Sequence, residues 1–462
     1  MGGAGLRGLV ARGPCAPPAA RWGTSLPRYT AHSPPEADRV SGPMSAFDAP
    51  RDGLYTGPGR SPVSNLPLGR GSSRGFATAV YVDHAATTPI RPEVLEAMLP
   101  YLRGQWGNPS SLYGPGRQAR QAVDRARRTL GDILGCSPDE IVFTGSGSEG
   151  ANLAIKGVAL AAPPHRNHLV TSRVEHHAVL DTCKWLASRF GFEVTYLDVD
   201  ENGVIDLDQL EREITGRTAL VSVIYANNEV GTIQPIQDVA RIAHARGVPV
   251  HTDAVQAAVS LSLDIEMLGV DLLSIAGHKF YAPKGIGALY VRRGTRLAPL
   301  VHGGGQERGR RSGTENVPYI VGMAEAIALV QSARESNNAR LGQMARRMLN
   351  ELPSRVPGCR VTGHRTARLP NHASFVFEDV EVASVLMGLD RQNIWASSGS
   401  ACTSASSEPS HVLVAMKVPR RYLFGALRLT FGIDNEPADV DTLLEVIPPL
   451  VASARLAASM AA

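Results

Sequence analysis

The stretch VPVHTDAVQAAVSLSLDIEMLGVDLLSIAGHKFYAPKG, residues 248–285, decides the fold. It contains two short aliphatic runs, 248–251 and 272–275, joined by a segment that is compatible with a helix. Runs of this length and composition predict buried strands. Similar runs occur earlier in the chain, at 141–143, 168–170, 194–196 and 220–225. Repeated strand, helix, strand units predict an α/β fold with a mostly parallel sheet covered by helices on both faces.

Helical spacing of apolar residues appears on both sides of this core. One such pattern predicts a helix that ends at Gly135. A longer helical stretch is predicted for 317–352, where Pro353 breaks it. Beyond it, strand-like runs at 373–377 and 427–431 and a helix-like segment at 440–451 predict a smaller α+β region.

These patterns divide the chain into three expected parts. Residues 1–79 form a disordered leader or a transit segment. Residues 80–335 form the large domain, whose N-terminal segment 80–100 packs on the small domain. Residues 336–462 form the small C-terminal α+β domain, which carries a cysteine-containing loop.

The leader differs in composition from everything that follows. It is rich in glycine and proline and has no sustained apolar period, so it cannot bury enough surface to offset the entropy of ordering. Residues 1–35 contain four arginines and no acidic residue, a composition typical of organelle transit peptides. An unstructured extension, or a start site downstream at Met44, explains the sequence equally well. We therefore expect a cytoplasmic protein, with the mitochondrial matrix or a plastid as the alternative.

The formal net charge of +4 comes from the leader. Nine arginines and four acidic residues lie in 1–79, which leaves 38 basic and 39 acidic residues in 80–462. This balance gives no reason to expect direct binding to nucleic acid or to a membrane surface. The apolar stretches are also much shorter than the roughly 20 residues that a membrane-spanning helix requires.

The five cysteines include no CxxC pair, so the sequence predicts neither a disulfide framework nor a zinc site. No resident metal is expected. Cys402 lies in ASSGSACTSASSEP, residues 396–409, where small residues cannot form a rigid apolar packing unit. A thiol on such a loop is exposed and able to react as a thiolate. A surface cysteine without a task is the alternative.

Residues 144–150, TGSGSEG, follow a predicted strand and open a predicted helix. The bare backbone N–H groups and the helix dipole of such a turn bind anions, so a phosphate group can lie here. The turn also contains GxGxxG, and Glu175 follows at about the distance that a dinucleotide site requires. A purely structural glycine turn explains the same pattern.

Three side chains near predicted strand ends suggest cofactor chemistry. Lys279 follows a buried strand, where desolvation lowers the pKa of an amine and makes it a candidate for imine formation. Asp253 ends the preceding strand, where it can hold the proton on a pyridine nitrogen or simply cap a helix. His176 lies between a strand and a helix, and its ring can stack on an aromatic cofactor and relay protons. Adjacent histidines such as His176 and His177 also occur in solvated loops.

Together these features resemble the pyridoxal-phosphate-dependent cysteine desulfurases, in the class V aminotransferase-like group whose loop reads SSGSACTSAS. The likeness runs from Tyr81 to Val451. Its further segments, in the same order and spacing, are DHAATTP at 83–89, WGNPSS at 106–111, ANNEVG at 226–231, GGGQER at 303–308 and RSGTEN at 311–316.

The resemblance implies the pyridoxal-phosphate fold-type I and a homodimer with both active sites at the subunit interface. It also implies conversion of L-cysteine to L-alanine, with the sulfur left as a persulfide on Cys402. The expected acceptors are iron–sulfur scaffold proteins or enzymes of tRNA and cofactor thiolation. Cys402 could also ligate an iron–sulfur cluster transiently during transfer.

The resemblance implies catalytic roles for Cys402, Lys279 and His176. Lys279 would bind the cofactor covalently and shuttle the α-proton, and Asp253 would pair with the pyridine nitrogen while His176 stacks on the ring. Gln256 and Asn228 would contact the oxygen side of the ring.

The phosphate and substrate contacts also follow from the resemblance. The phosphate would be held by Gly147, Ser148, His278 and, from the other subunit, Thr314. Arg428 would bind the substrate carboxylate in a bidentate manner, with Asn108 nearby.

Two residues depart from the family pattern. Ala276 replaces a serine that many relatives have, which removes one phosphate hydroxyl, and Gly150 is expected to make the glycine loop more flexible. The missing hydroxyl at Ala276 predicts weaker cofactor retention without loss of activity.

Other functions fit parts of the sequence. The GQER and GTEN segments also resemble selenocysteine lyases, and another class V enzyme would use the same scaffold. A dinucleotide-binding protein built on Gly145 would not need Lys279. A non-catalytic sulfur carrier would only present Cys402 and would be colourless.

Overall fold

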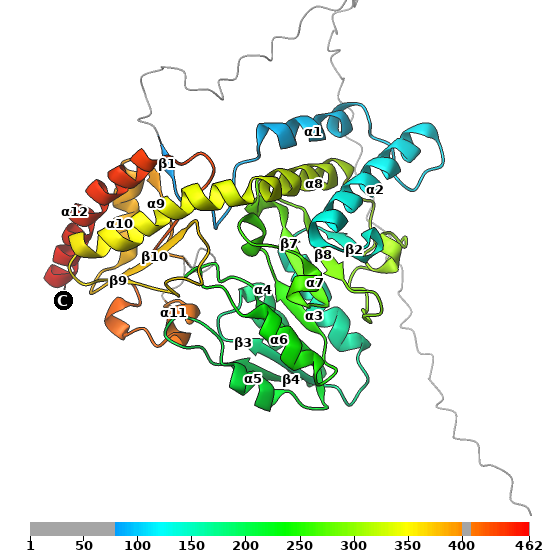
Figure 1. Cartoon of the computed structure of the whole chain (residues 1–462), viewed down its shortest axis with the longest axis horizontal. Helices are drawn as coiled ribbons and strands as arrows, with labels where there is room; N and C mark the ends of the chain where they lie inside the picture. Colours follow the sequence, from blue (N-terminus) through cyan, green and yellow to red (C-terminus); the bar gives the residue numbers. More distant parts are fainter. Residues whose placement is uncertain (1–78, 400–407, 462) are drawn as a thin grey trace, which may run out of the picture. The chain divides into compact units, whose positions relative to one another are not determined.

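The computed structural model describes residues 79–399 and 408–461 (Figure 1). The predictions for the leader, and that for the position of Cys402, therefore lie outside the described residues. The described chain forms a seven-stranded sheet, a three-stranded sheet and a two-stranded pair. Within these residues, no helix combines the length and the apolar character that crossing a membrane requires.

The large sheet has the strand order β2-β8-β7-β6-β5-β3-β4. Its strands are β2 (Ile141–Thr144), β3 (His168–Ser172), β4 (Glu193–Leu197), β5 (Thr218–Ile224), β6 (Val250–Asp253), β7 (Leu272–Ala276) and β8 (Gly287–Val291). Strands β3 to β7 pair in parallel, and β8 runs antiparallel to both of its neighbours, β2 and β7. The predicted α/β fold with a mostly parallel sheet is confirmed.

The sequence patterns did not reveal β8. Only residues 277–286 separate it from β7, and this connection is too short for the crossover that a parallel neighbour needs. The chain therefore turns back, and β8 is inserted between β7 and β2.

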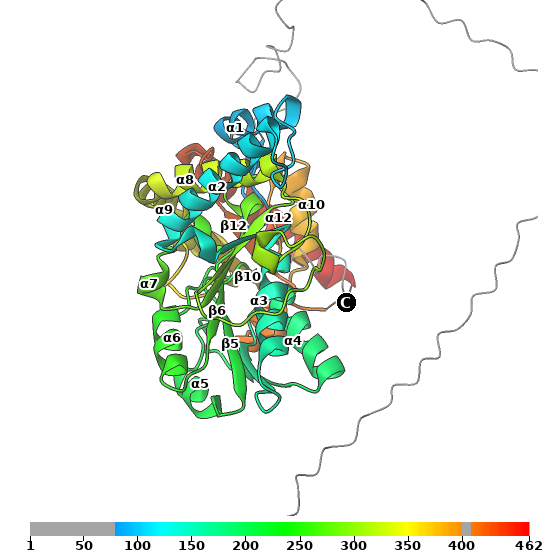
Figure 2. The ribbon, with the colours of Figure 1, turned by 90° about the vertical axis from the view of Figure 1, so that its right-hand side faces the viewer.

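Helices cover both faces of the large sheet, as Figure 2 shows. One face carries α3 (Gly147–Ala161) and α4 (His177–Phe190). The other carries α5 (Leu207–Glu213), α6 (Ile236–His244) and α7 (Ile265–Leu268).

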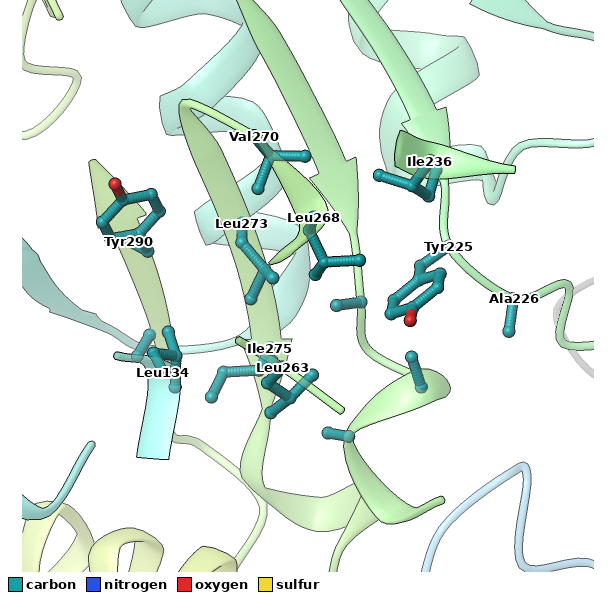
Figure 3. Packing of buried hydrophobic residues seen from close by; sticks show 14 of the residues in the cluster. Leu134, Tyr225, Ala226, Ile236, Leu263, Leu268, Val270, Leu273, Ile275 and Tyr290 are labelled. Carbon is teal, nitrogen blue, oxygen red and sulfur yellow. The ribbon is translucent and has the colours of Figure 1, made fainter. Parts of the chain in front are cut away.

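The side chains of β7 point alternately to the two faces of the sheet, which shows why both faces are covered. Leu272 packs in a cluster with α3 and α4, whereas Leu273 and Ile275 pack in the cluster on the opposite face. Successive residues of a strand point to opposite faces, so an uninterrupted apolar run needs cover on both. Figure 3 shows Leu273 and Ile275 in this second cluster with Leu134 and Tyr290.

Four helices extend the large region toward the rest of the chain. They are α1 (Pro92–Arg103), α2 (Gly114–Leu134), α8 (Val317–Ser332) and α9 (Arg334–Arg355). Helix α2 ends where predicted, because Gly135 adopts the left-handed conformation with φ 70°. In Figure 1, α9 continues from α8 toward α10 and α12.

The prediction of one helix that stops before Pro353 is wrong. The stretch is two helices separated at Ala333, and α9 passes through Pro353 to Arg355. A proline removes one backbone donor, a small loss in the last turn of a helix. Leu352 is fully buried just before it, and its carbonyl accepts a hydrogen bond from the Val356 N–H, which closes the helix.

The remaining elements form a smaller α+β region. Strands β9 (Cys359–Val361), β10 (His372–Phe377) and β12 (Ala426–Thr430) make an antiparallel sheet in the order β12-β10-β9. Its helices are α10 (Val382–Asp390) and α12 (Pro437–Ala461), whereas Val412 and Leu413 of α11 (His411–Ala415) lie in the apolar cluster of the large region.

Of the N-terminal segment 80–100, the first residues pack with this smaller region, whereas Val94 and Met98 of α1 lie in one apolar cluster with residues of α8. Strand β1 (Val80–Tyr81) pairs in parallel with β11 (Ile394–Trp395). Val80 and Val82 lie in one apolar cluster with residues of α9, β10 and α12. The domain limits at residues 79 and 335 stay predictions.

Candidate active site

A cavity of about 320 Å³ lies where several strands of the large sheet end. Asp253 is the last residue of β6, and Lys279 follows β7. Nine of the predicted site residues line this cavity: Gly147, Ser148, His176, Asn228, Asp253, Gln256, His278, Lys279 and Arg428. The carboxyl ends of parallel strands meet at one edge of a sheet, which explains how residues far apart in sequence converge here.

Three predicted site residues are not among the residues lining this cavity. Thr314 and Asn108 are exposed, and the Asn108 Oδ1 accepts a hydrogen bond from the Ser110 N–H at 2.9 Å. Cys402 lies outside the described residues. The roles of these three residues stay predictions.

The start of α3 forms a bare backbone cradle. Ser146 caps the helix by accepting a hydrogen bond from the Glu149 N–H at 3.0 Å. A Cβ atom on Gly147 would lie only 2.7 Å from the Val255 Cγ2 and 3.0 Å from the Ala276 Cβ, so the position requires glycine. The N–H groups and the positive end of the helix dipole at this point suit a phosphate group.

The expectation that Gly150 loosens a loop is wrong. Gly150 lies inside α3 and is buried. A Cβ atom there would lie 3.3 Å from the Ser274 Cβ, so the glycine lets the helix pack closely on β7.

The segment that follows β1 forms the wall behind Lys279. The Lys279 Nζ donates hydrogen bonds to the carbonyl oxygens of Ala85 at 2.6 Å and Ala86 at 2.7 Å. The Gln256 Nε2 also donates to the Ala85 carbonyl, at 2.8 Å. The Thr88 hydroxyl donates to the backbone carbonyl of His278 at 3.0 Å, which ties the wall to the strand that positions the lysine.

Asp253 and His176 form an electrostatic pair in the cavity. Burial raises the pKa of Asp253, while the nearby His176 and Lys279 oppose that shift. Burial lowers the pKa of His176, against the attraction of Asp253. The His176 Nδ1 accepts a hydrogen bond from the Ala178 N–H at 3.1 Å, so the proton of the neutral ring lies on Nε2.

His278 is also neutral near pH 7. Burial and, after it, the neighbouring Lys279 and Lys284 lower its pKa to about 4. Its Nδ1 lies 3.2 Å from the Thr87 hydroxyl. A neutral imidazole of this kind can donate one hydrogen bond to a phosphate oxygen without adding charge.

These residues fit pyridoxal phosphate. Gly147, Ser148 and His278 can hold its phosphate, and the amine of Lys279 can bind it covalently. Asp253 is a buried acid whose carboxylate a protonated ring nitrogen would stabilise. Ala276 contributes a methyl group to the cavity and no hydroxyl.

Arg428 lies on the opposite side of the cavity, on β12. Its side chain is only 2% exposed. The Nη1 donates to the carbonyl oxygens of Asn228 and Gly399, both at 2.9 Å, and the Nη2 donates to the Asp83 Oδ1 at 2.6 Å. A guanidinium held in this way can direct its remaining Nη2 hydrogen at a carboxylate, and the predicted bidentate contact stays a prediction.

Sequence reasoning gave no role to three further lining residues. The Glu229 Oε2 accepts a hydrogen bond from the Ser410 hydroxyl at 2.5 Å. The rings of His177 and His411 lie 4.9 Å apart, and the His411 Nε2 lies 2.9 Å from the Glu175 carbonyl oxygen. The only sequence signal for Glu229 was its place in the ANNEVG segment.

Glu175 does not serve a dinucleotide site. Its side chain is buried and accepts hydrogen bonds from the Ser172 hydroxyl at 2.5 Å and the Ile224 N–H at 2.9 Å. Burial raises its pKa to about 8. A carboxyl group engaged inside the core is not available to a ribose.

Comparisons with known proteins agree with this geometry. The model of the aminotransferase class-V family matches residues 80–443. The chain is 48% identical to the cysteine desulfurase IscS of Methanosarcina thermophila, over 82% of this chain and 93% of the relative. It is 46% identical to a cysteine desulfurase of Trichormus azollae, over 81% of this chain and 93% of the relative.

Solved structures show the same likeness. A NifS-like protein superposes with a TM-score of 0.76 at 37% identity, covering 81% of this chain and all of that one. SspA in complex with cysteine superposes with a TM-score of 0.68 at 38% identity, covering 76% of this chain and 98% of that one. The resemblance found in the sequence is confirmed: the chain belongs to the class V aminotransferase family and, within it, to the pyridoxal-phosphate-dependent cysteine desulfurases.

Proposed function

We propose that this enzyme transfers the sulfur of L-cysteine to Cys402 as a persulfide and releases L-alanine. The observation that carries the proposal is one cavity lined by Lys279, Arg428 and Gly399. Gly399 lies three residues before Cys402, and an extended chain spans at most about 3.6 Å per residue. This short separation in sequence from a residue of the cavity wall supports a role for the Cys402 thiol in attacking the substrate.

Arg428 and Lys279 have different roles toward the substrate, which are carboxylate binding and proton transfer. Arg428 binds the carboxylate and fixes the orientation of the amino acid. Pyridoxal phosphate, when bound, supplies an electron sink for the negative charge that develops at the α-carbon. Lys279 accepts the α-proton at Nζ, and the neutral His176 holds a second exchangeable proton at Nε2.

Sulfur transfer needs only one bond exchange. The thiolate of Cys402 attacks the sulfur of the substrate, so an S–S bond forms as the carbon–sulfur bond breaks. The electron pair of the broken bond remains on the substrate and takes up protons, which yields L-alanine. Cysteine and the enzyme thiol thus become alanine and an enzyme persulfide, and no external oxidant is consumed.

The same family likeness supports a homodimer, which we propose as the functional unit. Trp106 is 76% exposed, Leu112 is 90% exposed and Tyr113 is 53% exposed, and all three lie within eight residues of one another. Large apolar side chains gathered on a surface are typical of a protein interface. Thr314, absent from its own chain's cavity lining, would then contribute to the partner's site. Sedimentation of the purified protein should give twice the monomer mass, and a monomer would contradict the proposal.

The persulfide would pass to acceptor proteins such as an iron–sulfur scaffold or a thiolation enzyme. We propose that this occurs in the cytoplasm, because the composition of the leader also fits an unstructured extension. Sequencing the N-terminus of the protein isolated from cells tests this location. A mature N-terminus near Ala77 would instead indicate a removed transit segment.

The decisive experiment compares alanine release from L-cysteine by the wild type and by Cys402→Ser, both fully loaded with cofactor. The variant is expected to lose nearly all activity, because a hydroxyl cannot accept the sulfur. Cys359→Ser, which alters a thiol in β9 outside the cavity, is the matched control and is expected to remain active. Alanine release by Cys402→Ser at the wild-type rate would contradict the persulfide route. If Cys402→Ser turned over L-selenocysteine faster than L-cysteine, the result would favour a selenocysteine lyase.

A further inference from the structure

The guanidinium of Arg428 has only part of its hydrogen-bonding capacity left for a ligand. The two hydrogens of Nη1 are matched by two backbone carbonyls, those of Asn228 and Gly399. One hydrogen of Nη2 is taken by the Asp83 carboxylate. Nε is buried and has no hydrogen-bond partner among the described residues. The second hydrogen of Nη2 is therefore the one that remains for a ligand in the cavity, because protein atoms enclose Nε.

Asp83 is held firmly next to this arginine. The isolated bridge between Asp83 and Thr430 joins the segment after β1 to β12, two residues from Arg428. The Thr430 N–H donates to the Val82 carbonyl at 2.8 Å, and the Tyr81 hydroxyl donates to the Asp83 carbonyl at 3.0 Å. The carboxylate of Asp83 therefore reaches the arginine from a backbone that several bonds fix in place.

Burial makes the charge of this pair important. Arg428 is 2% exposed and Asp83 is 18% exposed, so the ion pair is largely shielded from water. A buried guanidinium without a counter-ion is strongly destabilised. The Asp83 carboxylate supplies that counter-ion before the substrate arrives, and its bond to Nη2, together with the two carbonyl contacts of Nη1, sets the angle of the guanidinium plane.

We propose that Asp83 is a positioning residue for substrate recognition, which holds Arg428 so that the remaining Nη2 hydrogen meets the carboxylate of the amino acid. The inference rests on the proposed function, in which Arg428 binds that carboxylate. It adds that the N-terminal segment, through one side chain, determines how strictly the enzyme requires a carboxylate on its substrate.

The test compares two ligands on the cofactor-loaded enzyme. L-cysteine carries the carboxylate, and cysteamine has the same amine and thiol without it. Asp83→Ala should raise the KM for L-cysteine about tenfold or more, because it removes a charge-assisted hydrogen bond from a buried group. The inhibition constant of cysteamine should change less than about twofold, since no carboxylate is involved.

Three variants accompany this measurement. Asp83→Asn keeps an oxygen acceptor for Nη2 without the charge and should recover only part of the affinity for L-cysteine. Asp198→Ala removes an exposed aspartate that pairs with Arg173 at 2.7 Å, and it controls for the loss of any Asp–Arg pair. Arg428→Gln should raise the KM for L-cysteine at least as much as Asp83→Ala, again with cysteamine unaffected. In the double variant Asp83→Ala/Arg428→Gln, the loss of Asp83 should add nothing further.

The outcomes distinguish the role of Asp83 from that of Arg428. An unchanged or lower KM in Asp83→Ala, with a raised KM in Arg428→Gln, would overturn the role of Asp83 and leave Arg428 as the carboxylate ligand. Equal weakening of L-cysteine and cysteamine in Asp83→Ala would show a general structural defect and would also overturn the proposal. An unchanged KM in Arg428→Gln would remove the assignment of Arg428 and, with it, the inference about Asp83.

Discussion

The two walls of the active-site cavity are built in different ways. The cofactor wall uses residues at the ends of strands of one sheet: Gly147 after β2, Asp253 in β6 and Lys279 after β7. The substrate wall joins Arg428 of β12 to Asp83, which lies 345 residues earlier in the chain. The strand ends of a single sheet place the residues of the first wall, and the Ala85 and Ala86 carbonyls then anchor Lys279, whereas the second wall depends on contacts between distant segments alone. Cofactor binding is therefore set mainly by the register of one sheet, and substrate recognition by how the N-terminal and C-terminal parts of the chain meet.

The largest effect is expected at the centre of the cofactor wall. Lys279→Ala removes the amine that binds the cofactor and moves the α-proton, so alanine release should fall by about a thousandfold or more. Lys284→Ala alters an exposed lysine five residues later and should keep activity within about twofold of the wild type. Alanine release by Lys279→Ala above a tenth of the wild-type rate would contradict the claim that the cofactor wall carries the largest effect.

A smaller effect is expected where the cofactor wall is most tightly packed. In Gly147→Ala the new methyl group would meet Val255 and Ala276, so we expect cofactor retention after dialysis to fall about tenfold. The bound cofactor is measured by its absorbance. Gly216→Ala is the matched control, because a Cβ atom there meets nothing within 4 Å. Equal retention in the two variants would show that the start of α3 does not hold the phosphate.

The smallest effect is expected on the substrate wall. Ser410→Ala removes the hydrogen bond to Glu229 and the cap of α11, so alanine release should fall about fivefold while cofactor retention stays unchanged. Ser410→Thr, which keeps the hydroxyl, should restore most of the rate. Ser336→Ala removes an exposed hydroxyl from α9 and serves as the control. A loss of cofactor in Ser410→Ala would mean that the two walls are not independent.

The cofactor wall could be predicted from the sequence because its signals are local. Lys279 and Asp253 each follow an apolar run that is long enough for a strand, and the glycine turn lies between a strand and a helix. Strand ends of this type meet at one edge of a parallel sheet, so the residues had to lie close together. The exception was Gly150. The sequence pattern predicted that it lies in a loop, but it lies within α3.

The substrate wall left almost no local signal. Nothing in the spacing of Asp83 and Arg428 indicates a contact, and only the resemblance to a family gave Arg428 a role. Strand β8 was missed for a related reason, because its pairing with β2 depends on how the chain returns after β7. The rule that proline ends a helix is local, and it predicted the wrong end here. Helix α9 continues through Pro353 to Arg355, with Leu352 buried beside it.

The pairing of the N-terminal segment with β11 and β12 has a consequence for biosynthesis. Residues 80–86 are made long before their partners, since Val80 and Tyr81 pair with Ile394 and Trp395, and Val82 bonds to Thr430. At about 5–20 residues per second, a ribosome needs roughly 20 to 70 seconds to reach those partners. During that time the large sheet can form, but the carbonyl groups that anchor Lys279 and the carboxylate that orients Arg428 have no fixed place. A nascent chain thus acquires the strand ends of its cofactor wall first, and a product truncated before β11 would lack both the fixed anchor of Lys279 and the substrate wall.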